Sequence, residues 1–557
     1  MVKVFCKNTG TSREFQEGTS LLDMLYEFEF DKPWPILAAK VNYVTQGLKF
    51  RVFSNKTVEF LDYRSYAGRG TYNRSLYFLL CKAAKDVYPD CSVTLKRPVS
   101  KGCLCILKKD GEIVNAGKAE AEAISARMRE LVKLNLPFRR FEVQTEEAVE
   151  MFRKLGQIDK VKLLETSGQV YVSYYTLDGT PDYFYDCLVP TTGMLDVWAL
   201  EPFDERFLIL RVPSRHNPGK TVPLQPQPKT MKAFDETMKW NSIMGLGNVG
   251  DVNEICSRGG ASTLIQVAEA LQEKKIVQIA EEIDRRYRSE TGPVRLVLIT
   301  GPTSSGKSTF CKRLSIQLAA CGLIPVSFST DDYFVNRVDT PKLPDGSYDF
   351  DNFDTVDHDA LQRDVLKLLA GEEVSVPEYN FVTGIREYNG KMLSLTPGKI
   401  LLIEGIHALN PALTNLVDES LKFRVFINTI TSISLDNHNS IPTSDNRLLR
   451  RIVRDFNKGA FSARESIAAW PNVRRSEVKW IYPYQETADV LFNSAYLVEF
   501  AVLRTHAEWI LSTVPKNCRE YGEAFRLIQF LSYFIPVSDK DVPATSLLRG
   551  FIGGGSF

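Results

Sequence analysis

The decapeptide TGPTSSGKST at residues 300–309 constrains the fold of this chain more than any other feature. It contains the pattern GxxxxGK[ST] between an apolar segment, VRLVLIT (294–300), and a segment of helical periodicity that begins at Lys307 and ends at Cys321. Backbone N–H groups of such a loop surround phosphate oxygens at the positive end of the helix. The sequence therefore predicts a nucleoside triphosphate site. The loop consists of Gly301, Pro302, Thr303, Ser304, Ser305, Gly306, Lys307, Ser308 and Thr309.

Within this loop, the motif assigns two side chains to the triphosphate. Lys307 should reach the β- and γ-phosphates, and Ser308 should ligate Mg²⁺. ATP and Mg²⁺ are the cofactors we expect from this reading.

Further apolar segments follow the loop at 324–330, 399–404 and 422–427, with helical patterns between them. Strands that alternate with helices predict an α/β domain with a parallel sheet covered on both faces.

Two carboxylates stand at the ends of predicted strands. Asp331 follows IPVSFST, and Glu404 ends KILLIE. Open α/β sheets bind ligands at the carboxyl ends of their strands, so both acids are expected near the phosphates. A carboxylate there can orient a hydroxyl nucleophile and accept its proton, and a second can hold the metal. Asp332 competes with Asp331, and spacing alone does not choose between them.

Four arginines in SDNRLLRRIVRDFNKG fall on one face of a helix. For Arg451 and Arg454 we expect pairing with nearby acids such as Asp455. For Arg447 and Arg450 two interpretations stay open. They pair with acids in the same way, or their guanidinium groups neutralise the charge of a phosphoryl group during transfer.

Residues 294 to about 500 resemble the uridine kinase/phosphoribulokinase family of P-loop kinases. The order of motifs carries the resemblance: the loop, STDDYF, YDFDNFDTVD, VPEYNFVTGIRE, ILLIEGIHAL, NRLLRRIVRD and ADVLFNS. It implies that Asp331 is the catalytic base and that Asp351 binds ribose hydroxyls. It also implies that Tyr379 and Phe381 flank the base, that Glu404 lies near Mg²⁺, and that Arg447 and Arg450 act on the substrate side.

The chain departs from this family at two places. Uridine kinases place a histidine three residues after the second aromatic, and here that residue is Gly384. The usual RGR of the lid is KGA, Lys458 to Ala460. The resemblance therefore implies phosphoryl transfer to a nucleoside 5′-hydroxyl, most simply of a uridine-like pyrimidine, but not selectivity for one base.

The N-terminal half resembles other proteins. Residues 1–62, with REFQEGTSLLDML and AAKVNYV, look like a β-grasp TGS domain. Residues 63–211, with SLYFLLCKAAKDVYPDC and YDCLVPTTG, are similar to the second additional (editing) domain of threonyl-tRNA synthetase. The HxxxH positions of that domain fall on Arg74 and Phe78, and Cys187 has lost its histidine partner. Several convergent ligands are needed for zinc, so we expect no zinc and no hydrolysis.

The rest of the chain divides by composition. Five prolines between 212 and 230 predict an extended linker. We expect a helical connector at 231–290, the kinase-like domain at 291–500 and a helical extension at 501–557. The glycine-rich C-terminal end suggests mobility and receives no role.

Charge and cysteine content set broader limits. A net charge of +1 disfavours a polyanion-coating protein, and ten cysteines without a CxxC pair indicate reduced thiols. No signal-peptide or membrane-spanning pattern is present, so a cytoplasmic protein is expected.

Two alternatives stay open beside a nucleoside kinase, and the oligomeric state is unknown. One is a kinase of another small alcohol, as in phosphoribulokinase. The other is a nucleotide-sensing module with weak RNA contact through the N-terminal half, where a basic strip lies at 95–109. The guanine-reading NKxD motif is missing, which disfavours a GTPase switch.

Overall fold

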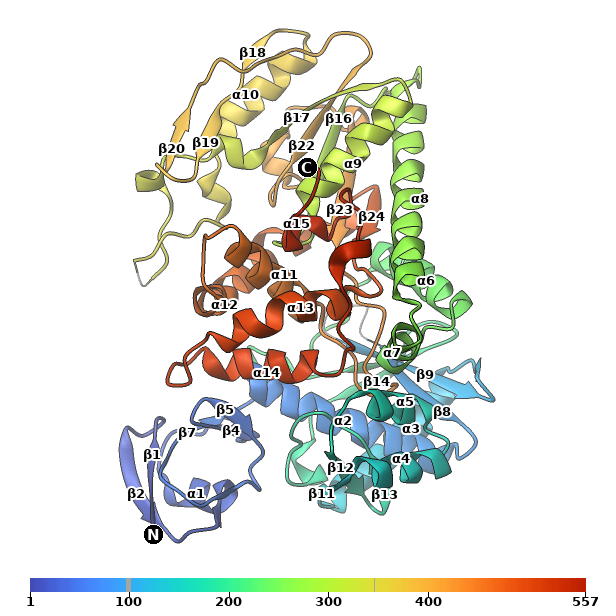
Figure 1. The fold of residues 1–557 in the computed structure, drawn as a ribbon, viewed down its shortest axis with the longest axis vertical. Helices are drawn as coiled ribbons and strands as arrows, with labels where there is room; N and C mark the ends of the chain where they lie inside the picture. The colour runs from blue at the N-terminus through green and yellow to red at the C-terminus, as the bar shows by residue number, and fades with distance from the viewer. Residues whose placement is uncertain (97–101, 345) are drawn as a thin grey trace.

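The computed structural model describes residues 1–96, 102–344 and 346–557 (Figure 1). The N-terminal module is a five-stranded sheet in the order β2-β1-β7-β4-β5, in which β1 and β7 are parallel. Residues Val2, Val4 and Cys6 of β1 are buried and alternate with exposed ones, because one face of the sheet packs on a helix. This is the expected β-grasp arrangement. Its elements are β1 (Val2–Cys6), β2 (Thr11–Phe15), β3 (Thr19–Ser20), α1 (Leu21–Glu27), β4 (Ala38–Val41), β5 (Val44–Gln46), β6 (Arg51–Val52) and β7 (Lys56–Leu61).

The second module packs two long helices against antiparallel strands. Helix α2 begins after Ser65, whose hydroxyl accepts the N–H of Gly68, and its middle is buried on nearly every side. Of the basic strip expected at 95–109, residues 97–101 lie outside the described residues, and Lys96 is buried. The elements are α2 (Tyr66–Val87), β8 (Ser92–Lys96), β9 (Gly102–Lys109), β10 (Glu112–Ile113), α3 (Lys118–Lys133), β11 (Arg139–Gln144), α4 (Thr145–Lys154), α5 (Ile158–Thr166), β12 (Tyr171–Leu177), β13 (Thr180–Asp182), β14 (Ala199–Pro202) and β15 (Leu208–Arg211).

The proline-rich segment after β15 is non-helical until Pro228, which begins helix α6 (Pro228–Ile243). Proline suits the first turn of a helix, because the N–H it lacks would have no partner there. Helices α7 (Val249–Ser257) and α8 (Ala261–Tyr287) follow, within the segment 231–290 for which we expect helices.

The kinase-like half is built on a parallel sheet in the order β17-β22-β16-β23-β24. The predicted strands are confirmed as β16 (Leu296–Thr300), β17 (Ile324–Ser329), β22 (Lys399–Glu404) and β23 (Lys422–Asn428). Strand β24 (Val490–Asn493) completes the sheet, and helices α9 (Lys307–Ala320) and α10 (His358–Leu369) flank it (Figure 1). Two small antiparallel sheets lie beside α10, formed by β18 (Val374–Ser375) with β21 (Met392–Leu393) and by β19 (Glu378–Asn380) with β20 (Ile385–Glu387).

Helices at the C-terminal end tie the two halves together. They are α11 (Thr443–Asn457), α12 (Ala463–Trp480), α13 (Glu499–Ser512), α14 (Tyr521–Leu531) and α15 (Arg549–Ile552). One hydrophobic core joins residues of α4 and α5, such as Phe152 and Leu164, to residues of α11 and α13. The core thus crosses the predicted boundaries at 211 and 500. Within the part of the chain that the structure describes, no helix is both long and apolar enough to cross a membrane.

Candidate active site

The phosphate loop connects β16 to α9 at the carboxyl edge of the parallel sheet. A Cβ at Gly301 would stand 2.2 Å from the carbonyl oxygen of Ile427, so only glycine fits beside the neighbouring strand. Gly306 has φ of 92°, in the left-handed region that favours glycine. Both glycines of the motif are therefore required by the backbone, and the loop opens directly onto the N-terminus of α9.

Lys307 and Ser308 take the places predicted for a phosphate and a metal. The Nζ of Lys307 donates to the Gly301 carbonyl at 3.1 Å, and burial lowers the pKa of its ammonium group. Lys307 forms no ion pair among the described residues, although the charges of Glu404 and Asp331 act on its pKa from a greater distance. The Ser308 hydroxyl donates to Oε1 of Glu404 at 2.9 Å, because β22 lies beside β16 in parallel register.

The two competing aspartates after β17 have different surroundings. Oδ2 of Asp332 accepts the Ser329 N–H at 3.0 Å and closes a capping box, which is a structural role. Asp331 instead faces Glu404 and Lys307. Burial, and next the charge of Glu404, raise the pKa of Asp331 to about 7. A carboxyl group with this pKa can exchange a proton near neutral pH, which suits a base, and the choice of Asp331 over Asp332 stays a prediction.

Asp351 approaches the same edge from the segment before α10. Burial raises its pKa to about 6, and the positive charge of Arg451 opposes that change. His407, which sequence reasoning missed, is buried against the ring of Phe353 at 5.5 Å. Burial lowers the pKa of His407 to about 4, so this imidazole is neutral at physiological pH. The motif ILLIEGIHAL contained this residue without indicating its burial.

Three aromatic rings form a cluster beside the site. Tyr379 lies 5.1 Å from Phe381 and 5.5 Å from Phe334, in edge-to-face contacts. Tyr379 is buried and its hydroxyl has no hydrogen-bond partner, whereas Phe381 is 62% exposed. The structure thus brings the two predicted aromatics together and adds Phe334 to them.

The space next to Gly384 is filled by Arg337. A Cβ at Gly384 would stand 2.7 Å from Nε of Arg337, and φ of Gly384 is 73°. The guanidinium donates to the carbonyl oxygens of Phe381 and Val382, while its Nε is buried without a partner. Arg337 therefore occupies the position from which a side chain at 384 would project. In the sequence, Gly384 indicates a position where a side chain is unfavourable. That Arg337 lies beside this glycine follows only from the tertiary structure.

Arg447 and Arg450 lie behind the phosphate loop and not in front of it. Both are fully buried. Arg447 pairs with Glu477 and donates to the Thr303 carbonyl at 3.0 Å, while Arg450 pairs with Glu499 and donates to the Ser304 carbonyl at 3.4 Å. In this arrangement both guanidinium groups stabilise the loop through its carbonyl oxygens. Their action on a transferred phosphoryl group stays a prediction that requires them to leave these pairs.

The next arginines along the helix pair with Asp455, as expected. Arg451 Nε lies 3.2 Å from Asp455 Oδ2, and Arg454 donates to Asp455 Oδ1 at 2.7 Å. Their charges still reach the site, because the charge of Arg451 lowers the pKa of Asp351 and that of Arg454 lowers the pKa of Lys307.

The C-terminal segment also contacts the loop. Phe551 of α15 lies 4.9 Å from the Arg450 guanidinium, and its carbonyl accepts from Asn457. Gly550 is so close to Thr309 that a Cβ there would stand 2.8 Å from its hydroxyl. Figure 1 shows the C-terminus beside α9. The C-terminal segment, to which we assigned no role, therefore packs on the phosphate loop.

The residues aligned with the synthetase editing site hold no hydrolytic group. Arg74 pairs with Asp186 at 2.9 Å, and Phe78 is buried. The Cys187 thiol contacts the Thr71 hydroxyl at 3.3 Å, and burial raises its pKa to about 12. A thiol in this state is neither a nucleophile nor a ready metal ligand.

Among the described residues, one cluster of a cysteine, an aspartate and a histidine could ligate a metal ion. The ammonium group of a buried lysine already balances the negative charge of this cluster. Donor atoms of Cys81, Asp182 and His438 lie within 4.8 Å of one another. The buried Nζ of Lys160 lies 3.2 Å from Asp182 and 3.3 Å from His438. A metal ion would have to displace this ammonium group, so the cluster fits a buried salt bridge. The expectation of no zinc stays a prediction.

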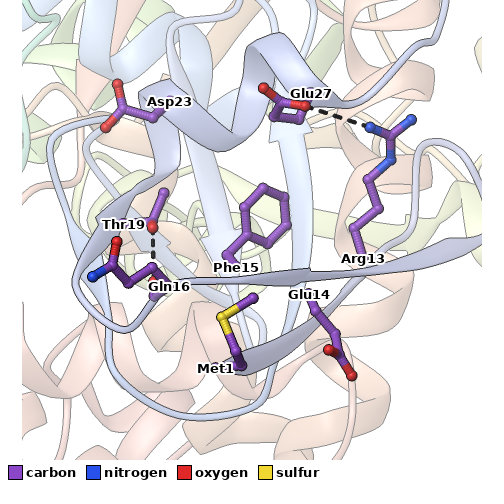
Figure 2. Close-up of a pocket in the computed structure, with 8 residues that line it drawn as sticks. All are labelled: Met1, Arg13, Glu14, Phe15, Gln16, Thr19, Asp23 and Glu27. Carbon is purple, nitrogen blue, oxygen red and sulfur yellow. Dashed lines mark hydrogen bonds and ion pairs between the residues drawn. The ribbon is translucent and has the colours of Figure 1, made fainter.

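A separate hollow of about 510 Å³ lies on the N-terminal sheet (Figure 2). The close-up shows Arg13 and Glu27 paired across its upper edge, 3.7 Å apart. No residue of the phosphate loop lines it.

Comparison with known proteins is consistent with this geometry. Residues 296–500 match the model of the Phosphoribulokinase / Uridine kinase family. This part of the chain is therefore similar to members of that family. Among solved structures, D-glycerate 3-kinase from Cryptococcus neoformans var. grubii is 13% identical, with a TM-score of 0.22, and the match covers 46% of this chain and 87% of that one.

The N-terminal part of the chain has different relatives. It is 26% identical over 196 residues to threonine–tRNA ligase of Desulforamulus reducens, which is 35% of this chain and 30% of the ligase. The ligase of Francisella tularensis subsp. novicida is 26% identical over 191 residues, again 30% of its length. The chain thus spans less than a third of these curated relatives.

Proposed function

We propose that residues 291–500 transfer the γ-phosphate of ATP to the 5′-hydroxyl of a uridine-like nucleoside. The observation that carries this proposal is Asp331, a half-buried carboxyl group with a pKa of about 7 beside Lys307 and Glu404. A group of that pKa is suited to take a proton from an alcohol near neutral pH. The match of residues 296–500 to a kinase family model supports the same reaction class.

Lys307 and the loop amides hold the triphosphate in this proposal. Lys307 makes no direct ion pair within the described residues, so its ammonium group can contact phosphate oxygens. The hydroxyl of Ser308 and the carboxylate of Glu404 lie together, and such hard oxygen donors suit Mg²⁺. When bound, Mg²⁺ supplies neutralisation of charge on the phosphates. These two residues would hold it.

The acceptor is held on the other side of Asp331. Asp351 accepts hydrogen bonds from ribose hydroxyls, and the exposed ring of Phe381 covers one face of the base. The unpartnered hydroxyl of Tyr379 provides one polar contact. Asp331 orients the 5′-hydroxyl and removes its proton as the phosphorus–oxygen bond forms, while ADP leaves. Arg447 and Arg450 support the loop that carries the triphosphate.

A kinase of another small alcohol is the second candidate, and Arg337 is the observation that favours it. This guanidinium fills the place of the imidazole that reads a pyrimidine edge in uridine kinases, and its Nε offers a buried donor. A donor of this kind suits a carbonyl, carboxylate or phosphate oxygen equally well.

A substrate panel tests both candidates. The purified chain is assayed with ATP and Mg²⁺ against uridine, cytidine, inosine, adenosine and several sugar phosphates. Turnover of a pyrimidine nucleoside, lost in Asp331→Asn, is the expected result. Turnover of a sugar phosphate alone would replace the first candidate by the second. No turnover of any acceptor would favour a nucleotide-sensing role for the loop.

A further inference from the structure

The order of strands in the parallel sheet gives the direction in which a bound donor nucleotide lies. Asp331 follows β17 and Glu404 ends β22, and both strands lie on one side of β16, which leads into the phosphate loop. In the proposed reaction the γ-phosphate points toward these acids. The rest of the nucleotide therefore extends to the other side of the loop, where β23 and β24 end. This direction rests on the proposed function, which takes the loop as the site of ATP.

Helix α15 of the C-terminal segment lies on that other side. The Arg450 guanidinium donates at 2.8 Å to the carbonyl of Ser494, which directly follows β24, and it lies 4.9 Å from the ring of Phe551 in α15. A Cβ at Gly306, the last glycine of the loop, would stand 4.0 Å from the same ring. The helix thus contacts the loop from the side of β24.

The first turn of α9 is bordered by the same segment. A Cβ at Gly550 would stand 2.8 Å from the hydroxyl of Thr309, so α15 approaches this turn as closely as a glycine allows. Backbone N–H groups of such a loop surround the α- and β-phosphates, so the nucleoside begins just beyond them. The C-terminal segment therefore borders the place where the nucleoside of the donor is expected.

A run of glycines turns the chain back after α15. Gly553 and Gly554 have φ of 87° and 70°, in the left-handed region that favours glycine. The guanidinium of Arg549 donates to the Gly553 carbonyl at 3.3 Å, and the N–H of Ser556 donates to the Ala544 carbonyl at 2.9 Å. These bonds hold the segment in a defined turn.

The turn brings Phe557 beside α9. The centroid of its ring lies 5.9 Å from Nζ of Lys312, which stands three positions after Thr309 and so on the same face of the helix. The ring is 40% exposed, and Figure 1 shows the C-terminus next to α9. Aromatic rings stack on the flat faces of nucleobases. The exposed ring is therefore suited to contact a base that projects from the phosphate loop.

From this placement we infer that the C-terminal segment forms the nucleoside wall of the donor site, with the ring of Phe557 stacked on the adenine of ATP. Gly550 and Phe551 position the wall, because they fix α15 to α9 and to the loop. Residues outside the segment 296–500, which matches the kinase family model, thus complete the donor site.

Calorimetric titration of the full chain with ATP and with tripolyphosphate, both in the presence of Mg²⁺, tests this wall. Tripolyphosphate fits the loop but has no nucleoside, so its affinity reports on the loop alone. Phe557→Ala should weaken ATP binding about 5-fold to 150-fold, the usual contribution of one base stacked on an aromatic ring. The same variant should leave the affinity for tripolyphosphate unchanged.

Two further variants and a control sharpen the result. Phe557→Tyr keeps a ring and should retain most of the ATP affinity. Gly553→Ala should weaken ATP binding as Phe557→Ala does, because φ of 87° resists a Cβ and the turn that places the ring is lost. Phe5→Ala is the matched control, because this ring of β1 is similarly exposed, at 39%, and lies in the first module. It should change neither affinity.

Three results would overturn the inference. They are equal ATP affinity in the parent and Phe557→Ala chains, tighter ATP binding in the variant, and equal weakening of ATP and tripolyphosphate. In the second case the ring would block the site, and in the third it would act on the loop and not on the base. A parent chain that binds neither ligand would refute the proposed function as well. Unaltered binding results without turnover of any acceptor would contradict only the proposed function.

Discussion

Replacement of Asp331 by asparagine should strongly reduce activity and, at neutral pH, stabilise the protein. Burial and the charge of Glu404 raise the pKa of Asp331 from the ordinary 3.8 to about 7. The folded state therefore holds this carboxyl group in an environment that disfavours its charge, whereas the unfolded chain does not. Asparagine keeps the shape and removes the charge.

The sign and size of the stability effect follow from proton linkage. A carboxyl group whose pKa is raised by folding stabilises the folded state fully at low pH, and that contribution disappears as the pH rises through the folded pKa. A shift of about three pH units corresponds to at most about 4 kcal/mol. The advantage of Asp331→Asn over the parent chain should therefore grow from near zero at about pH 4 to its maximum above about pH 7.

The assay compares unfolding midpoints of the two chains across this pH range, and kcat at a pH above 7. We expect kcat to fall about 10²-fold to 10⁴-fold, because the general base is lost. Asp354→Asn, an exposed carboxyl group in a nearby segment, is the control and should show no pH-dependent gain. A stability difference that is the same at pH 4 and pH 8 would refute the electrostatic argument. Near-parental kcat in Asp331→Asn, with an inactive Asp332→Asn, would move the base to Asp332.

Three further predictions concern buried charge, the acceptor pocket and zinc. Arg447→Ala should lower the unfolding free energy by about 3–5 kcal/mol, because it leaves Glu477 buried and unpaired, and adding Glu477→Ala should restore part of that loss in denaturation experiments. Gly384→Ala should raise KM for the acceptor, since φ of 73° and the adjacent Arg337 both resist a Cβ, and an unchanged KM would contradict the proposed pocket. Metal analysis of the purified chain should find no stoichiometric zinc, and one zinc per chain that is lost in Cys187→Ser would contradict our reading of the second module.

Residues close together in sequence allowed much of the kinase-like half to be predicted. The strand–loop–helix unit at 294–321 was readable because its glycines, lysine and apolar run each satisfy a local backbone or phosphate requirement. The acids Asp331 and Glu404 were found for a similar reason, since both end apolar strands and the carboxyl ends of parallel strands meet at one edge.

The contacts between distant residues required the tertiary structure. Four arginines on one helix face look alike in sequence, yet Arg447 and Arg450 are buried against Glu477 and Glu499 while Arg451 and Arg454 pair with Asp455. Those glutamates lie 30 and 49 positions away along the chain. No periodicity links such positions.

The division between local and long-range information has a physical cause. Sequence alone determined which segments form strands, helices and a phosphate loop, because backbone conformation and one-sided burial depend on neighbouring residues. Only the tertiary structure decided which charge is paired, that Arg337 fills the space beside Gly384, and that the C-terminal segment packs on the phosphate loop. These features depend on the desolvation and distance of groups brought together by folding, and neither quantity is encoded in sequence spacing.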